Sequence, residues 1–417
     1  MSLNLAMNTA PEVSPRAPLD EELAARFRPV FARIAAGALE REQARRLPYE
    51  EVEWLRAAGF GALRIPKEYG GLGASLPQFF ALLLELAAAD SNISHLLRGH
   101  FSFLESRLNH EDEATRAFWF PKVAQGALIG YAMAEQGAST TIGTTIVRTA
   151  DREGWLLNGK KFYSTGTIYA DWIVATALDG EQIVSLAFPA DLPGVQRLDD
   201  WDGFGQRMTG SGTTVFDNVR LRNEHVVRRF DGKPQPSYHK GFLQLILLTS
   251  IAGAGRAVLR DAVEFVQRKT RAFDVPGESS PRHDPLVQRV VGRIASLSYA
   301  ADTLVGGVAR ALEQAWQQAR AGTADDALYA ATEIQAFQAQ QVVIELVMQA
   351  SNLLFEVGGA SATSESRRLD RHWRNARTAA SHNPAIFRER AIGDYWLNGT
   401  PPSTRAADLS EGKERRE

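Results

Sequence analysis

The chain has 417 residues, of which 44% are hydrophobic and 23% charged, a composition typical of a globular protein with two or three domains. Its 47 basic and 49 acidic residues nearly balance, so no overall charge attracts nucleic acid or an anionic membrane. The chain has no cysteine, which excludes disulfides and thiolate chemistry, and it lacks an apolar run of roughly 18 residues that would span a membrane. These features predict a cytoplasmic protein without nucleic-acid or membrane partners.

The first 130 residues are predicted to be mainly helical. Residues 1–19 lack the pattern of a signal peptide and are expected to be disordered, and an N-terminal helical domain is expected over 20–130. Ser75 and Gln78 form a capping-box pattern at the start of an apolar stretch that ends near Asp90. Because apolar residues nearly encircle this helix, we expect it to be buried. A second helix is predicted over about 91–109.

The pattern then changes to short strands, which predicts a central β domain over 131–235. Asn158-Gly159 is a hairpin signal, and two further strands flank Asp179-Gly180. From residue 236 to 402 the pattern is helical again, with helices expected at about 241–272, 284–320, 324–356 and 366–380. Four helices in series indicate an antiparallel bundle, and residues 403–417 read as a polar tail.

Local motifs give little indication of function by themselves. The eight histidines are scattered without an HExxH pattern, so no metal site is predicted. The glycines at 70–73 lack the spacing of a dinucleotide fingerprint and read as a loop.

Several segments, in this order and spacing, resemble the acyl-CoA dehydrogenase superfamily over about residues 25–400. They are IPKEYGGLGAS (65–75), YAMAEQGAST (131–140), LNGKKFYSTGTIYADWIVATA (157–177), RKTRAF (268–273) and VGGASAT (357–363). The resemblance implies an α+β fold with an N-terminal helical domain, a central β-barrel-like domain and a C-terminal four-helix bundle. It also implies a homotetramer with flavin sites shared between subunits.

Two segments near the C-terminus resemble the flavin-dependent monooxygenase branch of this superfamily more than the dehydrogenases. They are RHWRNARTAASHNP (371–384) and GDYWLNGTPP (393–402). The resemblance implies the oxygenase component of a two-component monooxygenase, which takes reduced flavin from a partner reductase and acts with O2 on a small organosulfur or related apolar substrate.

Both positions at which dehydrogenases of the superfamily keep their catalytic glutamate lack an acid in this chain. One position falls near His382 or Asn383, and the other near Gln244 or Leu245. The missing acids favour the monooxygenase interpretation. Two alternatives stay open, namely an FAD-dependent acyl-CoA dehydrogenase with an unrecognised base, and a non-catalytic flavin-fold binding module.

Two histidines match the catalytic positions of the monooxygenase branch. They are His100 in the N-terminal helical region and His382 in the C-terminal segment, and imidazole can exchange a proton near neutral pH. The competing interpretations are a core histidine for His100 and a turn or cap residue for His382. Ala379 and Leu104 depart from the histidine and tyrosine of the sulfur-oxidising member, so the particular substrate stays open.

The resemblance also implies residues that bind the flavin, although each has a simpler interpretation as a strand, loop or helix-cap residue. A glutamine that holds the adenosine end in FAD-binding relatives is replaced by Phe355, which favours FMN over FAD. The predicted cofactor-binding residues are Tyr131, Met133, Ala134, Ser139, Tyr163, Ser164, Thr165, Arg271, Phe273, Gly358 and Gly359.

Overall fold

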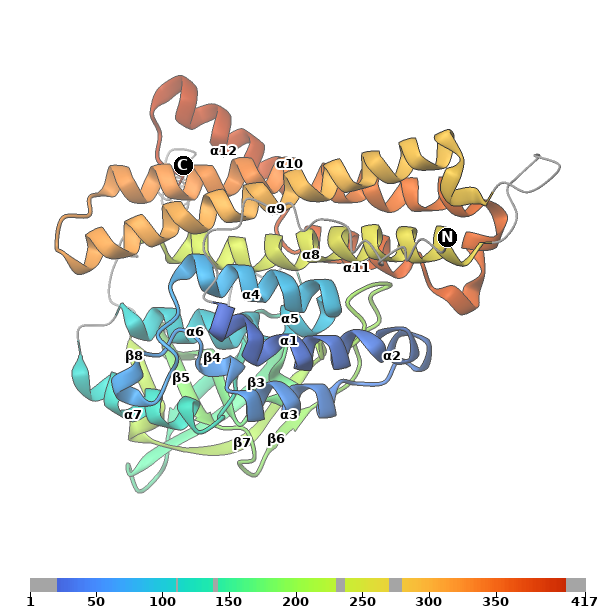
Figure 1. Ribbon diagram of the computed structural model, residues 1–417. Helices are drawn as coiled ribbons and strands as arrows, with labels where there is room; N and C mark the ends of the chain where they lie inside the picture. Colours follow the sequence, from blue (N-terminus) through green and yellow to red (C-terminus); the bar gives the residue numbers. More distant parts are fainter. Residues whose placement is uncertain (1–20, 110–111, 138–141, 230–236, 270–279, 403–417) are drawn as a thin grey trace, which may run out of the picture.

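The computed structural model describes residues 21–109, 112–137, 142–229, 237–269 and 280–402. Three long helices form one layer of the molecule, and a β-sheet lies on the opposite side with shorter N-terminal helices packed between and beside them (Figure 1). The order of helical, strand and helical regions agrees with the predicted α+β fold.

Within the described residues, seven α-helices precede the sheet, and the expected helix over 91–109 is in fact two helices that meet at Leu97. The capping box is present, because the backbone N–H of Gln78 donates to Ser75 Oγ and the N–H of Ser75 donates to Gln78 Oε1. The seven helices are α1 (Glu21–Ala36), α2 (Ala38–Ala44), α3 (Tyr49–Ala58), α4 (Leu76–Ala89), α5 (Ser91–Leu96), α6 (Arg98–Leu108) and α7 (Glu113–Ala124).

The central sheet is open rather than barrel-like. Its strands follow the order β6-β7-β3-β2-β4-β5-β8. Strand β1 lies outside this order and pairs in parallel with β4, and β2 contacts β4 at one residue pair, Thr145 and Leu178. The strands are β1 (Ile129–Ala132), β2 (Thr145–Arg148), β3 (Gly154–Lys161), β4 (Trp172–Asp179), β5 (Gln182–Pro189), β6 (Val195–Arg197), β7 (Thr214–Arg222) and β8 (Val226–Arg229).

The predicted hairpin at Asp179-Gly180 is present, whereas the prediction of a hairpin at Asn158-Gly159 is wrong. The strands β4 and β5 turn at Gly180, whose φ of 61° suits the turn. Asn158 and Gly159 instead lie inside β3, where the pairing with β7 shifts register. At Gly159 the φ is 142° and an added Cβ would lie 2.6 Å from Thr144 Cα, so glycine permits close backbone approach here and forms no turn.

The C-terminal region has three long helices and two short ones. Helix α11 starts at Arg371, because the preceding residues form short 3₁₀ turns between Gly359 and Arg367, so the expected fourth bundle helix is only ten residues long. The helices are α8 (His239–Arg268), α9 (Pro285–Arg320), α10 (Asp326–Gly358), α11 (Arg371–Ala380) and α12 (Ala385–Asn398).

Two of these helices, α8 and α10, are long and apolar enough to cross a membrane by length and composition. In α8 the most apolar stretch is 83% buried by other parts of the chain, which is expected of a central core helix. In α10 the corresponding value is 39%, so this helix leaves apolar surface uncovered by the single chain.

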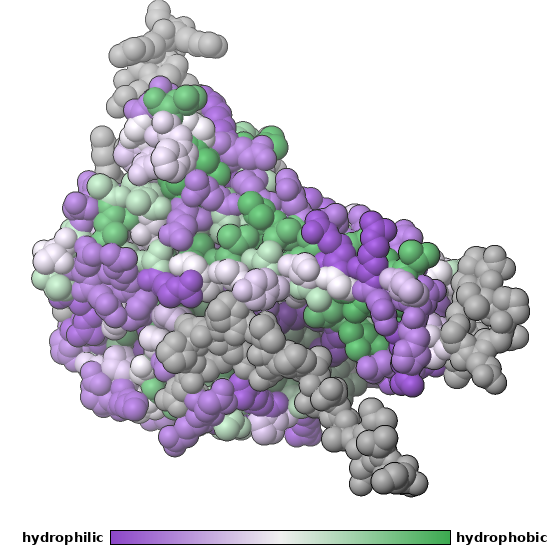
Figure 2. All heavy atoms as spheres, turned by 45° about the horizontal axis from the view of Figure 1, so that its top comes forward, coloured by the Kyte–Doolittle hydropathy of each residue, from purple (hydrophilic) through white to green (hydrophobic). Residues whose placement is uncertain are grey.

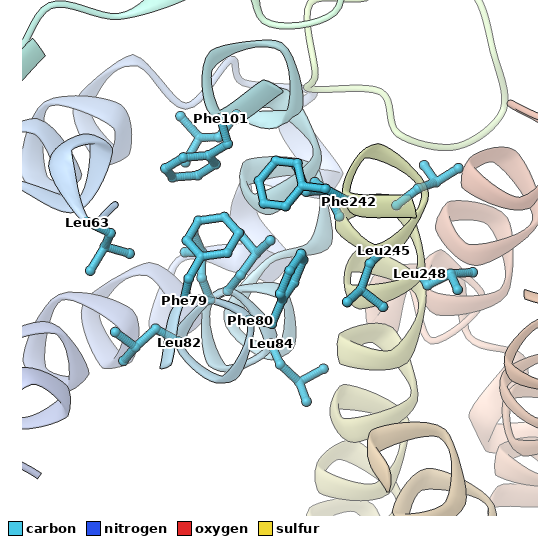
Figure 3. Close-up of a cluster of buried hydrophobic side chains, with 14 of the residues drawn as sticks. Leu63, Phe79, Phe80, Leu82, Leu84, Phe101, Phe242, Leu245 and Leu248 are labelled. Atoms are coloured by element: carbon cyan, nitrogen blue, oxygen red, sulfur yellow. The ribbon is translucent and has the colours of Figure 1, made fainter. Parts of the chain in front are cut away.

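An aromatic cluster fixes α6 against α4 and α8 (Figure 3). The rings of Phe79 and Phe101 lie 4.7 Å apart between centroids, and those of Phe80 and Phe242 lie 5.5 Å apart. All four side chains are buried, and burying each stabilises the packing by about 1.5–3 kcal/mol. The cluster thus sets the distance between the starts of α6 and α8, where polar residues of the candidate site lie.

Candidate active site

A chain of four polar side chains connects α6, the segment after α11, and α8. Arg98 Nη1 donates to His382 Nε2 at 3.3 Å, and His382 Nδ1 lies 3.2 Å from Asn383 Oδ1. Asn383 Nδ2 then donates to Gln244 Oε1 at 2.8 Å. A guanidinium can only donate, so His382 must accept at Nε2 and carry its proton on Nδ1. The donor and acceptor roles of His382, Asn383 and Gln244 in this series therefore follow from the charge of Arg98.

The charges around His382 keep its imidazole neutral. The pKa of His382 is lowered to about 4, first because its ring is desolvated among protein atoms and second because the Arg98 guanidinium repels a second cation. The residue as a whole is nevertheless exposed, so a ligand can reach it. Desolvation likewise lowers the pKa of Arg98 to about 10, which leaves the guanidinium charged at neutral pH.

His95 on α5 is the second histidine of this site. Its ring centroid lies 6.3 Å from that of His382, and its Nδ1 lies 3.2 Å from Gln206 Oε1. Gln206 uses its amide nitrogen to donate to Ser91 Oγ and Asn375 O, so its oxygen accepts and His95 carries the proton on Nδ1. His95 Nε2 is buried and has no hydrogen-bond partner within the described part of the chain.

Burial dominates the ionisation of His95. Desolvation, followed by repulsion from His382 and Arg98, lowers the pKa of His95 to about 3. Both histidines are therefore neutral near pH 7, and each keeps one nitrogen directed away from its anchoring amide. Two neutral imidazoles in a partly dry site can orient a substrate or exchange a proton with it.

His100, which was predicted to face His382, is anchored elsewhere. His100 Nε2 lies 2.9 Å from the carbonyl oxygen of Gly61, and the backbone N–H of Ile129 donates to His100 Nδ1 at 3.2 Å. The residue is 1% exposed, and an added Cβ on Gly61 would lie 3.0 Å from its Nε2. Both ring nitrogens are thus used by backbone groups, and the geometry favours a structural role that joins α6 to β1.

A buried ion-pair network positions α5 and hence His95. The carboxylate of Asp90 accepts from the backbone N–H of Asn92 and caps the helix. Arg41 pairs with Asp90 at 2.9 Å and with Glu51 at 2.9 Å, and all three side chains are buried. The network links α2, α3 and the start of α5, so it holds the short helix in a defined orientation.

Four of the predicted flavin-binding residues of the β domain lie on two neighbouring segments. Phe162 donates its backbone N–H to Ala134 O at 2.9 Å, which places Met133 and Ala134 beside Tyr163 and Ser164. The side chains of Met133 and Tyr163 are 38% and 52% exposed, so apolar surface is available there. In contrast, Ser164 Oγ is buried without a hydrogen-bond partner in the described residues.

Two further predicted residues, Thr165 and Tyr131, contact neighbouring hydroxyl groups. Thr165 Oγ1 lies 2.8 Å from Ser211 Oγ, and Ser102 Oγ lies 3.4 Å from the Tyr131 hydroxyl. Burial raises the pKa of Tyr131, so its hydroxyl stays protonated.

Glu135 fastens the loop that follows β1. It accepts from the Lys161 ammonium at 2.6 Å and from the backbone N–H groups of Gly143 and Thr144. Despite the opposing desolvation, these hydrogen bonds lower the pKa of the Glu135 carboxyl to about 2.

The other predicted cofactor residues lie away from the imidazoles or outside the described residues. Gly359 caps α10 with a φ of 56°, and the Gly358 carbonyl accepts from Lys269 Nζ at 3.0 Å. These contacts give the pair a helix-ending role within the chain. The predicted residues outside the described ranges are Ser139, Arg271 and Phe273.

Sequence reasoning missed His95, Arg98 and Gln206 as members of this site. His95 and Arg98 stand in the same HLLRGH segment as His100, but the break between α5 and α6 turns them toward His382. Gln206 has a φ of 52°, an uncommon backbone conformation for this residue type that sequence does not reveal.

Three family models match consecutive parts of the chain. They are the acyl-CoA dehydrogenase N-terminal domain over residues 20–127, the middle domain over 130–219 and the C-terminal domain over 245–385. The probable FMNH2-dependent monooxygenase SfnC of Pseudomonas putida is 30% identical over 96% of this chain and 99% of its own length. The chain belongs to the acyl-CoA dehydrogenase superfamily, among its flavin-dependent monooxygenases.

Other members of the superfamily support this placement. Dibenzothiophene monooxygenase of Rhodococcus qingshengii is 28% identical over 95% of this chain and 99% of its own length. FMN-bound TdsC from Paenibacillus sp. A11-2 has a TM-score of 0.83 and 27% identity, covering 92% of this chain and 98% of TdsC. Methanesulfinate monooxygenase MsuC from Pseudomonas fluorescens has a TM-score of 0.81 and 26% identity, covering 91% and 97%.

The two positions that lack the dehydrogenase glutamate meet in this acyl-CoA dehydrogenase fold. Asn383 and Gln244 lie in direct contact through the 2.8 Å hydrogen bond, although they are 139 residues apart in sequence. The region therefore holds amides and a neutral imidazole where a dehydrogenase holds a carboxylate. Within the described ranges, no group of three or more His, Cys, Asp and Glu could hold a metal ion.

Proposed function

We propose that the chain is the oxygenase component of a two-component monooxygenase that uses reduced FMN and O2 to oxygenate a small organosulfur compound. The observation that carries the proposal is the pair of neutral imidazoles, His95 and His382, next to a hydrogen-bonded amide pair that replaces the dehydrogenase carboxylate. A carboxylate base is what proton abstraction from an acyl-CoA would require, and the observed amides cannot supply it.

The residues present fit a flavin. Ser164 Oγ is a buried polar atom without a partner in the described part of the chain, and such an atom calls for a bound polar group. The exposed apolar surface of Met133 and Tyr163 lies next to Ser164 and can cover an aromatic ring. When bound, reduced flavin would supply the electrons that activate O2.

The protein's own groups would orient the substrate and exclude water. His382 lies at the accessible side of the site, and Arg98 sets its tautomer. Its Nε2 would hydrogen-bond a ligand by exchanging the 3.3 Å contact with Arg98, which a buried backbone-anchored ring such as His100 cannot do. His95 lies deeper, with Nε2 available as an acceptor. A hydrogen bond to a group that gains charge during the reaction typically changes the rate about 10²–10³-fold.

FMN is favoured over FAD because Phe355 stands where FAD-binding relatives have a glutamine. The name of SfnC refers to FMNH2, and TdsC is described as FMN-bound, which supports the same choice. A separate reductase would deliver the reduced flavin in the cytoplasm.

A homotetramer is proposed for the assembly. Helix α12 exposes four large apolar side chains, each at least 64% exposed, and α10 leaves apolar surface uncovered. Figure 2 shows apolar patches among the charged side chains on the face that carries the bundle. Such surface is expected to be covered by another copy of the chain. The four side chains are Ile386, Phe387, Trp396 and Leu397.

The test compares wild type with His382→Ala and with His283→Ala, which changes an exposed histidine outside the site. Reduced FMN is supplied by an unrelated reductase, and O2 consumed, oxygenated product and hydrogen peroxide are measured with thioethers, sulfoxides and sulfinates. We expect His382→Ala to bind FMN but to lose product about 10²–10³-fold and release peroxide instead. Wild-type coupling in His382→Ala, or no product from wild type with any substrate, would contradict the proposal.

A further inference from the structure

Arg98, which is half-buried, differs from the fully buried arginines Arg41 and Arg64 in its charge partners. Arg41 pairs with Glu51 and Asp90, and Arg64 binds Glu105 through two nitrogens at 2.9 and 3.1 Å. Arg98 forms no ion pair with any described residue. Its protein contacts are the Leu243 carbonyl, 3.4 Å from Nε, and the neutral His382 ring, 3.3 Å from Nη1.

The guanidinium of Arg98 has five N–H donors, and only two contacts with described residues engage them. Because the residue is half-buried, the remaining donors can be reached by a ligand, and an anion would compensate the partly desolvated charge. Desolvation is the main cause of the lowered pKa of Arg98, and among the causes only the Tyr131 hydroxyl opposes it. The negative charge of a bound ligand would offset this desolvation of the guanidinium.

A second donor without a partner, the side-chain amide of Gln244, lies near Arg98. Gln244 is 3% exposed, its Oε1 accepts from Asn383, and its Nε2 has no partner within the ranges that the structure describes. Leu243, which touches Arg98, precedes Gln244 on α8, and Asn383 follows His382. One cationic donor and one neutral donor therefore border the same region, and this is the donor set that a small oxyanion requires.

We propose that Arg98 and Gln244 bind an oxyanion on the substrate, so that the enzyme selects small organosulfur anions over neutral compounds of the same shape. This inference rests on the proposed function, because it places the substrate at the His382 site. Family membership leaves the choice open, since the relatives include a methanesulfinate monooxygenase and a TdsC complex with indole. In this chain, the positive charge of Arg98 favours an anionic substrate.

The probes are benzenesulfinate and methyl phenyl sulfoxide, which have similar shape but differ in charge. Their affinities are measured by calorimetry on the full-length protein with saturating oxidised FMN, so the result does not depend on turnover. We expect wild type to bind benzenesulfinate at least about tenfold more tightly than the sulfoxide, which is the discrimination of one effective ionic contact. Arg98→Gln should abolish the preference, while Arg98→Lys should retain part of it.

Gln244→Glu provides a second variant of nearly the same shape. The new carboxylate would pair with Arg98 and compete with the anion, so benzenesulfinate affinity should fall at least about tenfold while the melting temperature is maintained or raised. This variant keeps the inference testable if Arg98→Gln does not fold.

The FMN affinity of Arg98→Gln separates the two sources of an anion. We expect it to stay within about twofold of wild type, because the substrate and not the flavin phosphate contacts Arg98. Equal wild-type affinities for the two probes, a preference that persists in Arg98→Gln, or a tenfold loss of FMN affinity in that variant would overturn the inference. Absence of oxygenated product with a normal anion preference would instead contradict only the proposed function.

Discussion

Replacement of His100 by glutamine separates a structural from a catalytic histidine. Glutamine can still donate a hydrogen bond to the Gly61 carbonyl, but it loses the acceptor for the Ile129 N–H. Leaving that buried donor unpaired should lower the free energy of unfolding by about 1–3 kcal/mol at pH 7. The effect on the pH dependence of stability is more specific.

Burial lowers the pKa of His100 from 6.5 to about 4. The unfolded chain therefore binds this proton below pH 6.5 while the folded chain does not, so stability is present above pH 6.5 and is lost as the pH falls toward 4. Between pH 7 and pH 5, one such histidine removes about 2 kcal/mol of stability. His100→Gln should lose about 2 kcal/mol less than wild type over this range.

The assay is urea unfolding followed by circular dichroism at pH 7 and pH 5, with the protein concentration held constant. His283→Gln is the matched control, since it removes one exposed histidine. The same loss between pH 7 and pH 5 in wild type and His100→Gln would refute the assignment of a buried neutral imidazole. The variant should also keep wild-type coupling of O2 to product at pH 7, and uncoupling in a stably folded variant would restore His100 as a catalytic candidate.

Other predictions concern the helix cap, the chemistry, the cofactor and the assembly. Arg41→Met should destabilise the chain by about 3–5 kcal/mol, because it leaves the buried Asp90 without its cation and Glu51 with Arg46 alone, and urea unfolding measures this. Acyl-CoA thioesters should not bleach bound oxidised flavin without oxygen, whereas bleaching would indicate a dehydrogenase. Reduced FMN should bind the apoprotein more tightly than reduced FAD by titration, with the opposite order disproving the role given to Phe355. Light scattering at micromolar concentration should show a tetramer, and a monomer would rule out the proposed interface.

Local sequence patterns determined the class of fold and the family. The capping box at Ser75 and the turn at Gly180 depend on residues that are close in sequence, and both are present. The ordered motifs indicated the acyl-CoA dehydrogenase superfamily, which the family models confirm. His382 could be selected because its position within a recognisable segment does not depend on distant contacts. The Asn158-Gly159 pattern failed, since pairing with β7 overrides the local preference for a turn.

Only the tertiary structure decided which polar groups share a site. His95 and His100 are five positions apart, and local sequence gives no reason to prefer either as the partner of His382. The turn between α5 and α6 and the packing of α6 on α8 direct His95 toward His382 and anchor His100 to backbone groups. The Arg98 environment is likewise non-local, because its contacts come from residues 145 and 284 positions away. Burial and charge pairing depend on such contacts, and these become defined only when the helices pack.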